Sequence, residues 1–197
     1  TSRNFIKKSN TTMKKLSDNI LPLYTSNDIK KRVKELGEEI SKKYKNRNPI
    51  IIGVLNGSFI FLADLVRQIK LDCRIDFIQV SSYSGEKSLG KIKLLKDISI
   101  NIKNEDIIII EDIVDTGITL KFIFKYIKTK SPKSLSIATL IYKPKIKKNI
   151  YPIDFIGFEI PNKFVVGYGL DYNQKMRHLD GIYYLKNSFL TKGENDK

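Results

Sequence analysis

The apolar residues of this chain fall into short continuous runs and helical stripes. The clearest run is Ile107-Ile108-Ile109-Ile110, which has polar residues on both sides. A half-exposed strand alternates apolar and polar residues, so an unbroken run predicts a strand that is covered on both faces. Asp106 to Glu111 is therefore predicted to be a central parallel strand. Ile50 to Leu55 is a second apolar run, and Ser134 to Tyr142 is predicted to be another strand.

Helical stripes separate these strands. Ile29, Val33, Leu36 and Ile40 recur every three or four residues, which predicts one face of a helix from about Asp28 to Tyr44. Further helices are predicted for residues 59–69 and 119–130, and further strands for residues 73–81 and 182–185. Alternating strands and helices indicate a doubly wound α/β sheet, which binds its ligands outside the carboxyl ends of the strands.

Candidate chemistry gathers at the end of the central strand. Glu111 and Asp112 stand there, and Asp115-Thr116-Gly117-Ile118-Thr119 leads into the next predicted helix. A glycine turn with threonine hydroxyls and the free N–H groups of a helix N-terminus is suited to hold a phosphate. The carboxylates would repel that phosphate unless they face hydroxyl groups, a metal ion or a proton to be removed. The pattern predicts a sugar phosphate ligand; the alternative is a buried strand that ends in a solvated acidic turn.

The segment from Glu111 to Thr119 resembles the phosphoribosyl pyrophosphate (PRPP) motif of the type I phosphoribosyltransferases, and its Glu-Asp pair is most similar to the 6-oxopurine (hypoxanthine-guanine) branch. The resemblance implies the type I phosphoribosyltransferase fold, a central mainly parallel sheet flanked by helices, with a small hood. It also implies that Glu111 and Asp112 hold ribose hydroxyls or water around magnesium. Asp115 would serve as general base or acid at purine N7, and residues 115 to 119 would cradle the 5′-phosphate. Ile118 stands where some members have lysine.

A second stretch, Asp154 to Tyr172, is similar to the Phe-Val-Gly-Phe-Glu-Ile-Pro-Asp-Lys-Phe-Val-Val-Gly-Tyr sequence of the same family. The resemblance implies that Phe164 stacks on the purine and that the backbone of Val165 contacts its Watson-Crick edge. Asp171 would bind magnesium, largely through water, and Arg177 would meet the pyrophosphate. Taken alone, Phe164 would be assigned to the core and Arg177 to the surface.

Weaker matches lie between these motifs. In the family a lysine at the position of Lys143 donates to O6 of the purine, which favours 6-oxopurines over adenine. The bond between Leu55 and Asn56 corresponds to a cis peptide whose amide, with Gly57, meets pyrophosphate; Asn56 stands where the best-known members have lysine. Ser82 and Tyr83 resemble the flexible loop that closes over the active site. Without the resemblance, Lys143 would be a surface lysine, Leu55 and Asn56 would belong to an ordinary turn, and Ser82 and Tyr83 would belong to a polar loop.

Together these matches imply transfer of the phosphoribosyl group from PRPP to N9 of hypoxanthine or guanine, giving IMP or GMP plus pyrophosphate in purine salvage. The implied cofactor is Mg²⁺, and the implied assembly is a homodimer or homotetramer.

The composition indicates the class of protein and the compartment in which it is expected. The 197 residues are 41% hydrophobic, which suits one globular domain, and no apolar run approaches the roughly 20 residues of a membrane span. The single Cys73 fits a reduced compartment, and a cytoplasmic location is expected. Residues 1–15 are predicted to be a basic N-terminal extension, residues 16–187 a single phosphoribosyltransferase domain, and residues 188–197 a C-terminal tail.

Two other functions are compatible with the sequence. A phosphoribosyltransferase of the same fold could use xanthine, adenine or another base. The formal net charge of +15 would also suit a PRPP-fold regulator that binds RNA, but the charge is scattered along the chain and nucleic acid is not the expected partner.

Overall fold

The computed structural model describes residues 19–82, 92–144 and 152–186, without the side chain of Ser82. The chain divides into two compact units, which we treat separately. The sheet unit comprises Lys30–Asn162, and the terminal unit combines Thr1–Ile29 with Lys163–Lys197. The terminal unit is thus built from the two ends of the chain.

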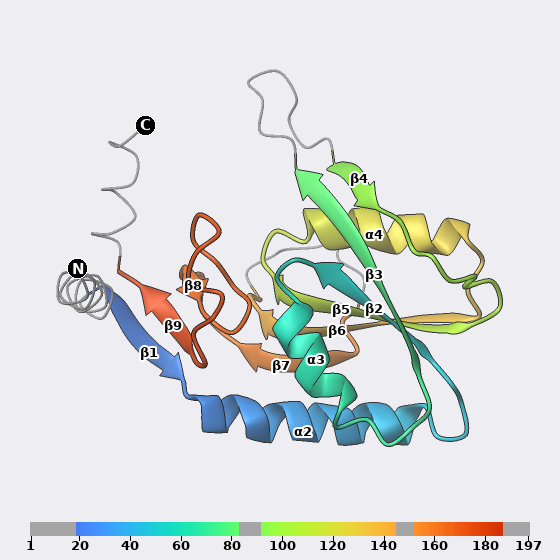
Figure 1. Cartoon of the computed structure of the whole chain (residues 1–197), viewed down its shortest axis with the longest axis horizontal. Helices are drawn as coiled ribbons and strands as arrows, with labels where there is room; N and C mark the ends of the chain where they lie inside the picture. Colours follow the sequence, from blue (N-terminus) through green and yellow to red (C-terminus); the bar gives the residue numbers. More distant parts are fainter. Residues whose placement is uncertain (1–18, 83–91, 145–151, 187–197) are drawn as a thin grey trace, which may run out of the picture. The chain divides into compact units, whose positions relative to one another are not determined.

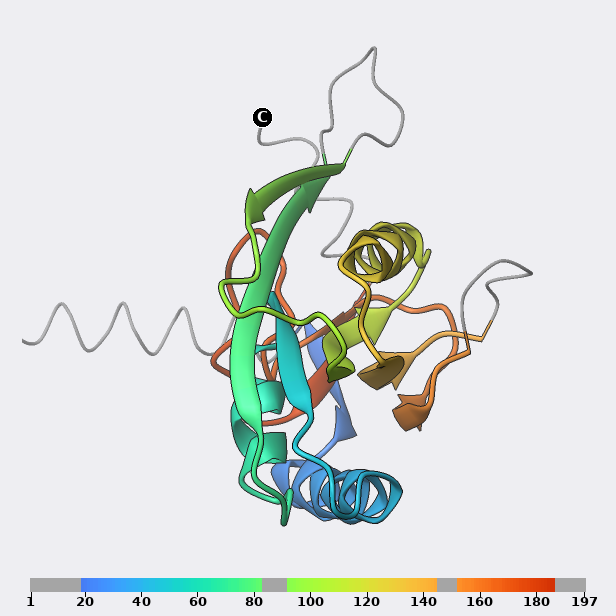
Figure 2. The same ribbon diagram turned by 90° about the vertical axis from the view of Figure 1, so that its right-hand side faces the viewer.

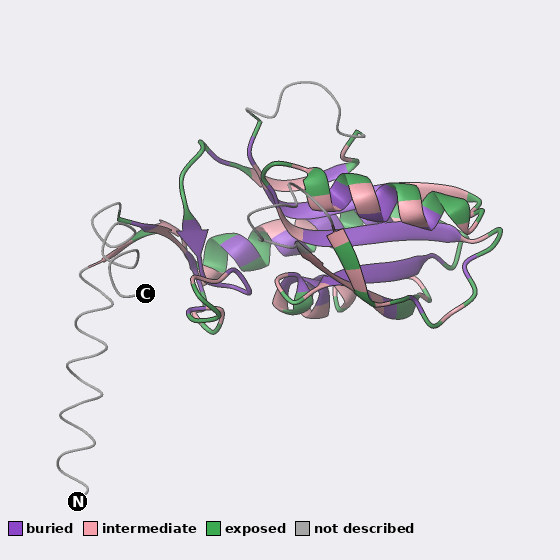
Figure 3. Ribbon diagram, turned by 90° about the horizontal axis from the view of Figure 1, so that it is seen from above, coloured by how far each residue is buried: buried purple, intermediate pink, exposed green. Residues whose placement is uncertain are grey.

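The sheet unit contains, among the described residues, a six-stranded sheet in the order β4-β3-β2-β5-β6-β7 (Figure 1). Neighbouring strands are parallel except β3 and β4, which are antiparallel. The isoleucine run of β5 is fully buried, and Figure 3 shows buried residues along the central strands. The predicted mainly parallel sheet is confirmed. The bounds are β2 Ile50–Leu55, β3 Arg74–Ser82, β4 Ile92–Lys96, β5 Asp106–Val114, β6 Ser134–Tyr142 and β7 Phe155–Glu159.

Helices cover both faces of this sheet. Helix α4 (Ile118–Thr129) packs its buried face against one side, in a core that includes Ile107 and Ile109. Helix α3 (Phe59–Val66) lies on the opposite side, with α2 (Ser26–Lys43) beside it (Figure 1, Figure 2). No helix in the described ranges is long and apolar enough to cross a membrane.

Helix α2 begins at Ser26, two residues before the predicted start at Asp28, because Thr25 and Asp28 form a reciprocal cap. The Asp28 N–H donates to Thr25 Oγ1 at 3.3 Å, and the Thr25 N–H donates to Asp28 Oδ2 at 2.9 Å. Such a box satisfies backbone donors that the first helical turn leaves without partners. The hydrophobic stripe could not locate this cap, since it starts only at Ile29.

Two other predicted boundaries in the sheet unit were wrong, and one of its strands was missed. Strand β5 continues to Val114 rather than ending at Glu111, because β6 extends beside it and pairs Val114 with Tyr142. Helix α3 ends at Val66 instead of Ile69. Strand β4 was not predicted, since its lysines interrupt the apolar pattern. The consequence for function is that Glu111 lies inside a paired strand.

The terminal unit contains a small antiparallel sheet in the order β1-β9-β8, formed by Ile20–Tyr24, Ile182–Leu185 and Val165–Val166. Val166, Met176 and Leu185 form its buried cluster. The predicted strand 182–185 is confirmed. The other two strands were not predicted, because one contains Pro22 and the other has only two residues.

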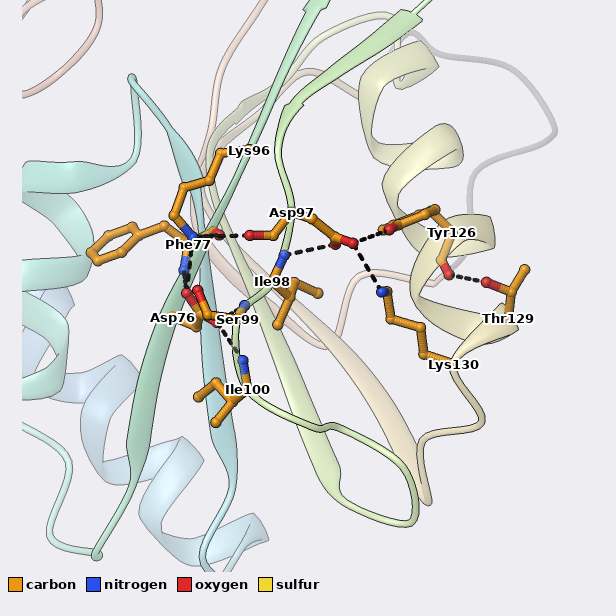
Figure 4. A network of polar contacts seen from close by, with 10 residues as sticks. All are labelled: Asp76, Phe77, Lys96, Asp97, Ile98, Ser99, Ile100, Tyr126, Thr129 and Lys130. Carbon is orange, nitrogen blue, oxygen red and sulfur yellow. Dashed lines mark hydrogen bonds and ion pairs between the residues drawn. The ribbon is translucent and has the colours of Figure 1, made fainter.

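A polar network in the sheet unit ties β3 and β4 to the segment that leads toward β5 (Figure 4). The buried carboxylate of Asp76 accepts from the N–H groups of Phe77 at 2.7 Å, Ser99 at 2.5 Å and Ile100 at 3.0 Å, and from Lys96 Nζ at 3.1 Å. Asp97 in turn accepts from Tyr126 and Lys130 of the α4 region. The network fixes a long connection that has no strand partners of its own.

Replacing Asp76 with alanine should lower the free energy of unfolding by roughly 3 kcal/mol, because three partly buried N–H groups and the ammonium group of Lys96 would lose their acceptor. Chemical denaturation measures this change. Asp72→Ala, at an exposed acid four residues earlier, serves as the control and should change stability little. A change below about 0.5 kcal/mol in the Asp76 variant would show that water replaces the carboxylate.

The same carboxylate predicts a pH effect. Burial by itself raises the pKa of Asp76, but the hydrogen bonds from Phe77, Ile100, Lys96 and Ser99 outweigh it and lower the pKa overall. A lowered native pKa stabilises the fold above the unfolded value of about 3.9, and this contribution is lost as the pH falls through the native value. Wild type and Asp76→Ala should therefore differ most near neutral pH and converge in acid.

Candidate active site

The carboxyl end of β5 carries two adjacent acids with different environments. Glu111 is buried, and its Oε2 atom has no hydrogen-bond partner within the described part of the chain. Burial, and secondarily the carboxylate of Asp112, raise the pKa of Glu111 well above the usual range. Asp112 is half-buried, and its Oδ1 accepts from the N–H of Ile113 at 2.8 Å. A buried carboxyl oxygen without a partner is a candidate to receive a ligand hydroxyl or a water on a metal ion.

The end of β2 lies against this acidic edge. The peptide bond between Leu55 and Asn56 is cis, as the resemblance implied. A Cβ atom added to Gly57 would overlap with the carboxylate of Asp112, so the backbone of this turn is in close contact with the acid. The Asn56 side chain accepts from Gln79 Nε2 at 3.3 Å. The structure therefore brings the predicted pyrophosphate turn and Asp112 together.

The predicted phosphate cradle lies at the start of α4. Gly117 occupies the N-cap position with φ 70°, a left-handed conformation that glycine adopts readily. As a glycine it offers no side chain to the first-turn N–H groups, and the Ile118 N–H makes only a long contact of 3.5 Å with Thr116 Oγ1 among the described residues. Ile118 is 55% exposed and provides no side-chain donor. Backbone N–H groups, two threonine hydroxyls and the helix dipole remain to bind an anion.

Lys143 lies directly after β6 and is nearly buried, with 6% of its side chain exposed. Its Nζ is 2.6 Å from Oδ2 of Asp115, which is half exposed. The pair forms because β5 and β6 are parallel neighbours, so that their carboxyl ends meet at one edge of the sheet. The structure thus brings the amino group of Lys143 next to an accessible carboxylate, beside the predicted phosphate cradle.

The terminal unit carries the other predicted residues. Val165 is buried in β8, paired with Tyr184 of β9, whereas Phe164 is 41% exposed. The Phe164 carbonyl accepts from the Leu185 N–H at 3.0 Å. A large apolar ring with this exposure, on a backbone held by a strand, is available as a stacking surface.

Asp171 and Arg177 form an ion pair in the same unit, with Asp171 Oδ1 at 2.8 Å from Arg177 Nη2. Arg177 also donates to the carbonyl of Gly169 at 2.7 Å and to Gln174 Oε1 at 3.1 Å, while the Gln174 N–H donates to Asp171 Oδ2 at 2.8 Å. Sequence reasoning missed Gln174. Its signal was the regular three-residue spacing of Asp171, Gln174 and Arg177.

The two units divide the predicted residues between them. The sheet unit holds Asn56, Gly57, Glu111, Asp112, Lys143 and the cradle from Asp115 to Thr119. The terminal unit holds Phe164, Val165, Asp171 and Arg177. Ser82 ends β3, and Tyr83 lies outside the described residues.

Within the described ranges, no three histidine, cysteine or acidic side chains are grouped as a metal site would require. Of the predicted magnesium ligands, Glu111 and Asp112 lie in the sheet unit and Asp171 lies in the terminal unit. Carboxylate oxygens are nevertheless the donors that Mg²⁺ prefers, usually one or two of them completed by water and substrate phosphates. The residues present fit that mode of binding.

The sheet unit is a doubly wound α/β sheet, the class of fold that binds its ligands outside the carboxyl ends of the strands, and the acids and the predicted phosphate cradle lie at those ends. Residues 21–173 match the family model for the phosphoribosyl transferase domain, and the chain belongs to this family. The resemblance found in the sequence is confirmed.

Three individual proteins show how similar the chain is to members of this family. The chain is 51% identical over 154 residues to the hypoxanthine phosphoribosyltransferase of Buchnera aphidicola subsp. Schizaphis graminum, covering 77% of this chain and 87% of that protein. It is 43% identical over 165 residues to the hypoxanthine-guanine phosphoribosyltransferase of Bacillus subtilis, covering 83% and 92%. A crystal structure of a hypoxanthine phosphoribosyltransferase from Staphylococcus aureus superposes with a TM-score of 0.83 at 39% identity, covering 88% of this chain and 96% of that one.

Proposed function

We propose that this chain transfers the 5-phosphoribosyl group of PRPP to N9 of hypoxanthine or guanine. The bond from N9 to C1 of the ribose forms, the bond from C1 to the pyrophosphate oxygen breaks, and the base gives up one proton. The observation that carries the proposal is the contact of 2.6 Å between Lys143 Nζ and Asp115 Oδ2, next to the phosphate cradle. The similarity to enzymes named for this reaction supports it.

The Lys143 and Asp115 pair matches one edge of a 6-oxopurine. O6 and N7 lie side by side on that edge; O6 accepts hydrogen bonds, and in the free base N7 can carry the proton that is lost as N9 reacts. Lys143 is a pure donor and would bind O6, whereas the exposed carboxylate of Asp115 would accept a proton from N7 as N9 attacks. Adenine carries an amino group at position 6, which offers Lys143 no equivalent acceptor.

The remaining residues have roles on either side of the reacting carbon. The backbone from Asp115 to Thr119 would bind the 5′-phosphate, and Glu111 and Asp112 would receive the ribose hydroxyls. Asn56 and Gly57 offer backbone groups to the pyrophosphate, and the planar guanidinium of Arg177 suits the same group. Phe164 and Val165 would hold the base by stacking and by backbone hydrogen bonds.

We further propose that Glu111, Asp112 and Asp171 would hold Mg²⁺, directly or through water. When bound, the ion offsets the negative charge of the pyrophosphate. The unpartnered, buried Oε2 of Glu111 supports this assignment in the sheet unit.

A coupled assay that offers PRPP with hypoxanthine, guanine, xanthine or adenine tests the proposed function. Turnover of hypoxanthine and guanine is expected, with adenine inactive. A preference for adenine would contradict the role of Lys143. Absence of turnover with every base, together with a salt-sensitive and specific RNA complex, would favour the regulator instead.

Replacing Lys143 with alanine should raise the KM for guanine about 10- to 100-fold, the range expected for a lost hydrogen bond from a charged donor. The KM for PRPP should change little. Lys133→Ala provides a matched control, since Lys133 is exposed and pairs with Asp106 at 3.8 Å just before the other end of β6. Unchanged guanine kinetics in Lys143→Ala would refute the assignment.

A further inference from the structure

Tyr172 lies against the predicted stacking residue, although the sequence gives it no role. The ring centroids of Phe164 and Tyr172 are 5.8 Å apart and their planes are inclined by 87°. This edge-to-face arrangement is one that aromatic pairs prefer, because the positive edge of one ring meets the negative face of the other. The contact restrains the plane of the Phe164 ring.

Phe164 needs such a restraint. Its carbonyl is held by the Leu185 N–H, but the residue is 41% exposed, so the core alone does not set its rotamer. A flat base stacks well only if the ring presents its face. A ring that rotates freely has to be ordered at each binding event, at an entropic cost to affinity.

Tyr172 is itself well held. Its N–H donates to the carbonyl of Lys175 at 3.1 Å, and the Lys175 N–H donates back at 3.0 Å, which closes a tight turn. The Tyr172 ring packs against the buried cluster of Val166, Met176 and Leu185. A side chain that is anchored at both its backbone and its ring can orient a neighbour that is anchored only at its backbone.

We propose that Tyr172 is a positioning residue that holds the Phe164 ring ready to stack on the purine base. The proposal rests on the proposed function of the chain. Tyr172 also follows Asp171 directly, and the Gln174 N–H within the same turn donates to Asp171. One turn therefore supports both the base platform and the Asp171–Arg177 pair.

The test compares steady-state kinetics of wild type, Tyr172→Leu, Tyr172→Met and Tyr172→Phe with hypoxanthine and PRPP. Losing the ring in the Leu and Met variants should raise the KM for hypoxanthine about five- to tenfold, with kcat and the KM for PRPP nearly unchanged. Tyr172→Phe keeps the ring and should behave as wild type. Tyr183→Leu is the matched control, since Tyr183 packs on the same cluster and forms no ring contact with Phe164 in the described part of the chain. It should lower the melting temperature but not raise the KM for hypoxanthine.

A double variant distinguishes a positioning role of Tyr172, exerted through Phe164, from a general loss of structure. If Tyr172 acts through Phe164, Phe164→Leu/Tyr172→Leu should have the same KM for hypoxanthine as Phe164→Leu alone. Additive effects, or a wild-type KM in folded Tyr172→Leu and Tyr172→Met, would overturn the role of Tyr172. A wild-type protein without turnover would instead overturn the proposed function, so the two failures are distinct.

Discussion

The Asp115→Asn variant should show a kcat about 10²- to 10⁴-fold below wild type, the usual contribution of a general base. Asparagine has nearly the same shape, and its amide oxygen can still accept from Lys143, which lies 2.6 Å from the carboxylate in the native chain. It cannot take a proton from N7. Binding of IMP and the KM for PRPP should therefore change much less than turnover, as steady-state kinetics and calorimetric titration with IMP would measure.

A matched control removes one carboxylate elsewhere in the sheet unit. Asp64 lies in α3 and pairs with Arg67 one helical turn away, so Asp64→Asn changes the same charge on a surface pair. Its kcat should equal that of wild type. A wild-type kcat in Asp115→Asn would overturn the proton-transfer role and leave Asp115 as a partner of Lys143 only.

Much of the sheet unit could be predicted because its pattern is local. The run Ile107–Ile110 needs no distant information to indicate a covered strand, and the glycine and threonines after Asp115 mark a helix start that can bind phosphate. Alternation of strands and helices then fixes which edge of the sheet carries the chemistry. For the same reason Lys143 and Asp115 could each be placed at that edge.

Other features depend on tertiary contacts that no local pattern records. The contact between Lys143 and Asp115 joins residues 28 positions apart, and it follows from the pairing of β5 with β6. That pairing also extends β5 to Val114, beyond the apolar run. The orientation of Phe164 is set by Tyr172, an effect of packing within the terminal unit. Phe164 could be predicted as a stacking residue only through the resemblance, because the sequence around a single phenylalanine does not distinguish a stacking residue from a core residue.

Gly57→Ala should lower kcat/KM for PRPP about 100-fold, the effect expected when a reacting or binding group is displaced by about 1 Å. The new methyl group would overlap with the carboxylate of Asp112, so either the turn after β2 or the acid must move. Both the turn and the acid are proposed to bind PRPP, so displacement of either should weaken the binding of that substrate. The KM for hypoxanthine should rise less than the KM for PRPP, which steady-state kinetics with each substrate varied in turn would measure.

Gly37→Ala separates this local effect from crowding in general. A Cβ atom at Gly37 of α2 would meet Gln68, so this variant is also expected to lose stability, but it lies far in sequence from every predicted site residue of the sheet unit. Its melting temperature should fall while its KM for PRPP stays at the wild-type value. The two variants could instead show the same rise in the KM for PRPP at the same loss of stability. The close contact between Gly57 and Asp112 would then be a packing feature without a role in binding pyrophosphate.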